Sequence, residues 1–133
     1  MIVHAVVVCL RHLPILILIN LAWPPADLPS LVDDFRTTPF QTPVVIPVLD
    51  NDLAAADHPL TLDSDSIISG PTNGTVVVNQ DGTVTYTPDN GFTGMDTFDY
   101  EACDNRDPPQ CDVATVTVLV ESDNNPPIAS EFV

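Results

Sequence analysis

Basic side chains are scarce in this sequence. It contains no lysine, and its three arginines are Arg11, Arg36 and Arg106. Nineteen acidic residues give the 133-residue chain a formal net charge of −16. Proteins bind phosphate groups through clustered lysine and arginine, so this composition argues against a nucleic-acid partner and against anionic membrane surfaces. Such a charge is typical of high solubility, a salt-rich setting or divalent cations.

Signatures of catalysis are also lacking. No serine lies in a G-x-S-x-G setting, and there is no H-E-x-x-H motif and no glycine-rich phosphate loop after a strand. His58 is the one histidine beyond the N-terminal stretch, and its polar loop predicts solvent exposure. Carboxylates are plentiful, but the single tryptophan, Trp23, lies too early to line a sugar cleft in the main body. We therefore expect a protein that is not an enzyme.

Long straight-chain residues are few and prolines number fourteen, which argues against helices in the main body. Short runs rich in β-branched residues stand there instead. Thr75–Asn79 and Thr83–Thr87 flank the pair Asp81-Gly82, a strong signal for a β-hairpin. Pro88 ends the second run because proline cannot donate to a strand ladder.

Further runs predict the remaining strands at Thr42–Leu49, Leu60–Leu62, Ser66–Ser69, Asp96–Cys103 and Ala114–Glu121. About seven strands at this spacing indicate an all-β protein, a Greek-key β-sandwich. The predicted core consists of Val44, Ile46, Val48, Ile67, Val76, Val78, Val84, Tyr86, Phe92, Phe98, Tyr100, Val116 and Val118.

The N-terminal residues 1–23 are strongly apolar and form a separate leader. Leu13–Leu21 has the length of a signal-peptide core, with Arg11 as its positive flank. Two alternatives stay open: a membrane anchor, although Arg11 and Pro14 interrupt the apolar run, and a misplaced start codon. Contact with a membrane is expected only through this leader, if it remains uncleaved. The proline-rich residues 24–31 read as a linker.

Cys103 and Cys111 bracket a loop between two expected neighbouring strands. In an exported chain the favoured interpretation is a disulfide, which leaves Cys9 in the removable leader. A zinc pair would require further cysteine or histidine ligands, and the spacing is not the C-x-x-C of redox proteins.

The stretch 71–100 follows the pattern P-x-N-G-T-V-x-x-N-x-D-G-T-V-T-Y-T-P-x-x-G-F-x-G-x-D-x-F-x-Y. Further matches are Asp33-Asp34, Val48–Asp52 and Asn124–Pro127, so that the pattern covers residues 32–129. It resembles the repeat unit of tandem cadherin-like or bacterial Ig-like surface-protein domains. The resemblance implies a secreted or cell-surface module with an adhesive or spacer role. Its partners would be neighbouring repeats or other surface proteins.

Acidic and amide side chains gather in three places that could converge on calcium, which takes six to eight oxygen ligands. The last of these resembles the cadherin linker between repeats, which implies Asp123, Asn124 and Asn125 as calcium ligands. The candidates for the domain's own share are Asp33, Asp34, Asp50, Asp52 and Asp96.

The linker departs from the usual Asp-x-Asn-Asp-Asn, because the second aspartate position is Asn124 or missing and one charge is lost. Asp and Asn are also the usual residues of turns, so solvated turns without metal remain an alternative.

The sequence therefore predicts a leader (1–23), a linker (24–31), one sandwich (32–122) and an inter-repeat linker that begins a further repeat (123–133). Two other functions stay open: a carbohydrate-binding module, which would need a row of exposed aromatics, and a structural spacer that binds no metal.

Overall fold

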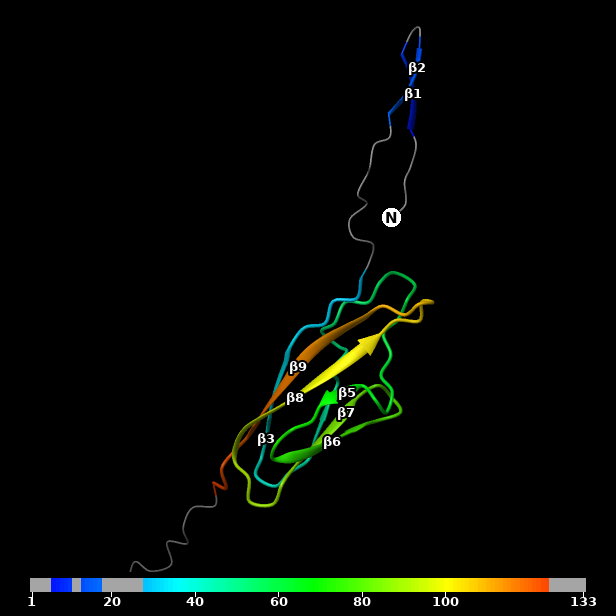
Figure 1. The fold of residues 1–133 in the computed structure, drawn as a ribbon. Coiled ribbons are helices and arrows are strands. Elements are labelled where there is room, and N and C mark those ends of the chain that lie inside the picture. Colours follow the sequence, from blue (N-terminus) through cyan, green and yellow to red (C-terminus); the bar gives the residue numbers. More distant parts are fainter. Residues whose placement is uncertain (1–5, 11–12, 18–27, 125–133) are drawn as a thin grey trace, which may run out of the picture.

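The computed structural model describes residues 6–10, 13–17 and 28–124. Its strands are β1 (Val6–Leu10), β2 (Leu13–Ile17), β3 (Asp34–Thr38), β4 (Val44–Ile46), β5 (Ile67–Ser69), β6 (Gly74–Val78), β7 (Val84–Pro88), β8 (Gly94–Cys103) and β9 (Cys111–Val120). Seven of them form two sheets, in the orders β3-β9-β8-β5 and β4-β7-β6 (Figure 1). The predicted all-β sandwich of seven strands is confirmed.

The β6–β7 hairpin has the predicted turn. Val78 pairs with Val84, and the Asn79 amide donates to the Thr83 carbonyl at 2.8 Å. Gly82 has φ +82°, a left-handed conformation that glycine adopts without a Cβ clash. Asp81 Oδ1 accepts bonds from both the amide and the hydroxyl of Thr83, which fixes the turn.

Strands β8 and β9 form the longest ladder, ten residues each, from Gly94–Val120 at one end to Cys103–Cys111 at the other. Alternate residues of both strands face the core, as the period of two requires. The core lies between the sheets, and the Tyr86 ring stacks on Phe98 with centroids 6.5 Å apart. The buried cluster is Ile46, Val48, Val84, Tyr86, Phe98, Tyr100, Ala102, Ala114, Val116, Val118 and Val120.

The remaining predicted core residues pack against this cluster while partly exposed: Val44, Ile67, Val76, Val78 and Phe92. Ala102, Ala114 and Val120 belong to the cluster but were missing from the prediction. Their positions follow from the alternation of β8 and β9, because each shares a face with the predicted valines and aromatics.

Two predicted strands are shorter than expected. Thr42–Leu49 contributes only the three residues of β4, because turns follow at Pro47, whose carbonyl accepts the Asp50 amide. Leu60–Leu62 contributes a single bridge between Thr61 and Cys103.

Strand β3 was missing from the prediction. It pairs in parallel with β9, with Asp34 opposite Val116 and Thr38 opposite Val120. Four of its five residues are polar, so the sequence shows no apolar alternation there, yet Asp34 and Thr38 are both buried. Before Val32, Ser30 pairs with Leu53 in an isolated antiparallel bridge.

Within the leader, β1 and β2 pair antiparallel, with Val8 opposite Ile15. In the described residues, no helix has the length and apolarity to cross a membrane. The export signal stays a prediction.

Candidate functional site

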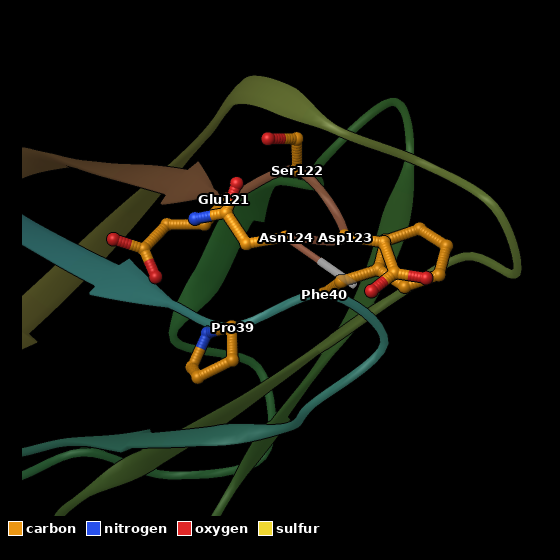
Figure 2. Close-up of a pocket in the computed structure, with 6 residues that line it drawn as sticks. All are labelled: Pro39, Phe40, Glu121, Ser122, Asp123 and Asn124. Atoms are coloured by element: carbon orange, nitrogen blue, oxygen red, sulfur yellow. The ribbon is translucent and has the colours of Figure 1, made fainter. Parts of the chain in front are cut away.

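The predicted calcium ligands fall into two separate places. Asp123 and Asn124 follow β9 at the end where the described chain leaves the sandwich. They line an open hollow of about 240 Å³ together with Pro39, Phe40, Glu121 and Ser122 (Figure 2). Figure 2 shows that this hollow lies between the segment after β3 and the segment after β9. Asn125 lies outside the described residues.

The second place is the edge where β3 meets the loop after β4. The chain packs Asp33 and Asp34 beside Asn51 and Asp52 there. Asp52 Oδ1 accepts the Val32 amide at 2.8 Å, and the Asn51 side-chain amide donates to the Val32 carbonyl at 3.3 Å. Two of the three acidic clusters thus converge, and we name Asp33, Asp34, Asn51 and Asp52 the edge cluster.

The edge cluster is tied to the core through Tyr100. The Tyr100 hydroxyl donates to Asp52 Oδ2 at 2.8 Å and lies 3.0 Å from the Val48 carbonyl. Burial, followed by the bond to Asp52, raises the pKa of Tyr100 well above its usual value. The hydroxyl therefore stays protonated and holds the Asp52 carboxylate in place.

Asp34 is the most buried acid of the edge cluster, with 5% of its surface exposed. Burial raises its pKa to about 6. Asp52 and Asp33 raise it further through charge repulsion, while Arg36 and the Asn51 side chain lower it. Among the described side chains, Asp34 Oδ2 is the buried polar atom without a hydrogen-bond partner.

Asp96, another predicted ligand, has its oxygens engaged by the protein. Its Oδ1 accepts the amides of Thr72 and Thr97 at 3.0 Å, and its Oδ2 accepts the Asn73 amide at 2.8 Å and the Tyr86 hydroxyl at 3.0 Å. These bonds join β8 to β7 across the two sheets and to the turn before β6. Asp96 thus has a structural role, and a metal role for it stays a prediction. Asp50, also predicted, lies exposed in the turn after Pro47.

A disulfide joins Cys103 to Cys111, the last residue of β8 to the first of β9. Inside the closed loop, Asp104 is paired with Arg106 and accepts the Gln110 amide at 3.0 Å. The bonded Arg106 side chain is the main cause that lowers the pKa of Asp104 to about 2. The predicted disulfide is present. The Asp104 carboxylate stabilises the loop that the disulfide closes, through its bonds to Arg106 and Gln110.

One group of described residues brings three potential metal ligands within 4.8 Å: Glu101, Cys103 and Cys111. Both sulfurs belong to the disulfide, and metals bind the thiolate form, so the oxidised protein has no thiolate pair here. His58, the histidine considered for catalysis, lies half-buried with Nδ1 at 2.8 Å from Asn105 Oδ1.

A carbohydrate-binding surface would need aromatic rings in a row on the exterior. Among residues 28–124, Phe35 is the aromatic side chain that is mostly exposed. Tyr86, Phe98 and Tyr100 are buried in the core, and Phe92 packs against it. The described residues therefore provide no aromatic row.

Comparison with known proteins gives one family. A family model described as "Bacterial Ig domain" matches residues 26–119. No curated protein matches the chain. A similar solved structure is described as a nucleoside hydrolase-related hypothetical protein from Saccharophagus degradans that is associated with carbohydrate metabolism. It is 10% identical, with a TM-score of 0.45, and the match covers 72% of this chain and 26% of that chain. This chain thus spans about a quarter of that protein.

Proposed function

The chain belongs to the bacterial Ig domain family, and on that premise we propose that it is an extracellular adhesive or spacer module of a cell-surface protein. Bacterial Ig domains are typically modules of surface proteins and are usually non-catalytic, and no enzyme family was found. The module would join neighbouring repeats of its own chain or other surface proteins.

The direction of the first and last strands of the sandwich carries this proposal. Strand β3 runs parallel to β9, so the chain enters at one end of the sandwich and leaves at the other. In Figure 1 the described chain reaches the sandwich at its upper end and departs below β9. A module with this path can be placed end to end with others, which suits a spacer.

The disulfide supports a location outside the cytoplasm. Disulfides persist in oxidising compartments and are rare where glutathione and thioredoxin keep thiols reduced. The Cys103–Cys111 bond therefore agrees with export of the chain to the cell surface or the medium. The apolar leader would supply the export signal.

Calcium at the exit end is the finer part of the proposal. Asp123 and Asn124, with Asn125 beyond the described residues, would bind calcium together with ligands of a following repeat. The open hollow beside Pro39 and Phe40 supports this, because Asp123 and Asn124 line it where the next module would adjoin. A bound cation would offset part of the −16 charge and stiffen the junction.

Single-molecule force spectroscopy tests the spacer role. Pulling the chain from both ends loads β3 and β9 in shear, so their five paired positions must yield together. We expect high unfolding forces, and a higher force in calcium than in chelator when a second copy follows the first. Asp123→Asn should remove that calcium effect. Unfolding at forces near those of domains whose terminal strands unzip would contradict the spacer role.

A further inference from the structure

Strand β6 lies at the edge of its sheet, because the order β4-β7-β6 gives it β7 as its one neighbour among the described strands. The other edge strands of the sandwich are short or charged. Strand β4 has three residues, β5 has three and a register shift, and β3 contains an aspartate and an arginine. Strand β6 has five residues with no charge, no proline and no bulge. Charges, prolines and bulges are what usually keep an edge strand from pairing with another chain, so β6 is open to such pairing.

The pairing of β6 with β7 uses only every second residue of β6. At one end the Asn79 amide donates to the Thr83 carbonyl at 2.8 Å. At the other end the Asp89 amide donates to the Asn73 carbonyl at 2.8 Å. Hydrogen-bonded and non-hydrogen-bonded pairs alternate along an antiparallel ladder. The residues in the non-hydrogen-bonded pairs, whose amides and carbonyls point away from β7, are Gly74, Val76 and Val78.

We name Gly74, Val76 and Val78 the β6 edge. Among the described residues, no group bonds to their backbone amides or carbonyls. Such a row of donors and acceptors is a template for one more strand. An open hollow of about 300 Å³ lies beside Val78, between residues 78–80 and 62–64, and leaves room for an incoming chain.

We propose that two copies of this chain pair antiparallel through the β6 edge, about a twofold axis at Val76. Val76 then lies opposite Val76 of the partner subunit, and Gly74 lies opposite the partner's Val78. Each of these pairs exchanges two hydrogen bonds, so the spacing of the β6 edge satisfies every one of its backbone groups in both copies. The two three-stranded sheets join into one sheet. A twofold contact uses the same surface on both copies, so it closes as a dimer and not as a fibre.

The distribution of charge favours a second copy in this direction. Two chains with a net charge of −16 repel each other, but residues 71–80 contain no acid. Where β6 turns into β7, Asp63 lines the hollow and Asp81 lies in the turn. Antiparallel pairing places this acidic end beside the uncharged residues 71–73 of the partner subunit, whereas parallel pairing would place acids against acids. Asp89 follows β7 and lies away from the β6 edge.

The contact goes beyond the proposed spacer role, which a single copy can perform, and it needs no metal. Sedimentation velocity of the full chain in chelator therefore tests it apart from calcium at the junction. We expect a reversible equilibrium between monomer and dimer. The dimer fraction should rise with salt, because salt screens the repulsion between two acidic chains. A chain that stays monomeric at every concentration and salt would overturn the proposal.

A charge exchange identifies the strand and its direction. Thr75 and Val77 are exposed on the outer face of β6, and antiparallel pairing places Thr75 opposite the partner's Val77. The double variant Thr75→Glu/Val77→Glu places like charges opposite each other and should weaken the dimer about tenfold. Thr75→Lys/Val77→Lys should weaken it for the same reason. Mixing the two variants should restore the dimer, because each glutamate then faces a lysine.

Val45→Glu/Met95→Glu is the matched control. Both residues are exposed, at 58% and 64%, and their cross-strand partners are Thr85 and Leu119, which are uncharged. The control adds the same charge away from the β6 edge and should retain the dimer. Equal weakening by the control and by Thr75→Glu/Val77→Glu would overturn the proposal. A dimer that neither charged β6 variant weakens, or that the mixture fails to restore, would overturn it as well.

Hydrogen exchange measured by NMR gives a second reading at single residues. The amides of Val76 and Val78 are unbonded in one copy and should exchange rapidly at low concentration. Their exchange should slow as the dimer forms, whereas the Val77 amide, which faces β7, should be protected throughout. Exchange at Val76 that stays rapid in a sample shown to be dimeric would place the interface elsewhere and refute the pairing.

Discussion

Replacing Asp96 by alanine should destabilise the domain severely. The substitution leaves the Thr72 and Asn73 amides and the Tyr86 hydroxyl without their acceptor in a region where Asp96 is only 5% exposed. A buried donor left unpaired costs about 1–3 kcal/mol. Removing the buried carboxylate itself returns part of that cost. We therefore expect the free energy of unfolding to fall by about 3 kcal/mol.

For a domain of about 100 residues, each kcal/mol lowers the melting temperature by about 4–8 °C, so Asp96→Ala should lower it by about 12–24 °C. Tyr86→Phe removes one of the bonds and should cost about 1 kcal/mol. Differential scanning calorimetry, with both single variants and the double variant, measures how strongly the two side chains are coupled. A loss for Asp96→Ala no larger than for Tyr86→Phe would refute the reasoning. So would a loss that appears only in the presence of calcium, which would make Asp96 a metal ligand instead.

Three further predictions concern single contacts. Reduction of Cys103–Cys111 should cost about 2–3 kcal/mol through the entropy of the opened loop, seen as a lower melting temperature in reductant; an unchanged melt would contradict this. Gly74→Ala should cost about 2 kcal/mol in chemical denaturation, because a Cβ would lie 2.6 Å from the Tyr86 ring, whereas Gly70→Ala has open space and should be neutral. Asp104 has a folded pKa of about 2 against 3.8 when unperturbed, so its contribution is complete above pH 4 and is lost as the pH falls toward 2. Melts from pH 5 to 2 should therefore fall less steeply for Asp104→Asn than for the parent, and parallel curves would argue against the shift.

The hairpin and the long ladder could be predicted from the sequence because their signals are local. Asp81-Gly82 determines the β6–β7 turn by backbone conformation alone. The alternation of apolar and polar residues in β9 places Val116 and Val118 on one face, and that face is buried. This pattern can be read without knowing which strands lie beside β9. The disulfide followed from the ladder, because Cys103 and Cys111 close its end.

Strand β3 could not be found in this way, and the acidic groups of the edge cluster were predicted only as groups that could converge. Parallel pairing of β3 with β9 joins residues about 80 positions apart, and no local pattern in Asp34–Thr38 indicates it. The burial of Asp34 depends on that pairing, and so does its approach to Asp52. Asp33-Asp34 and Asp50–Asp52 were recognised as acidic clusters, but their convergence is a tertiary contact. The bond from Tyr100 to Asp52 likewise spans 48 positions.

The closed loop between β8 and β9 offers a place for engineering. Its two ends are fixed covalently by the disulfide, and Asp104 with Gln110 closes the ring from inside. Residues 107–109 are exposed. They belong neither to the buried cluster nor to the apolar residues that pack against it. A foreign peptide grafted between Arg106 and Gln110 would thus be displayed on a short, oxidised stem, with the sandwich beneath it unchanged.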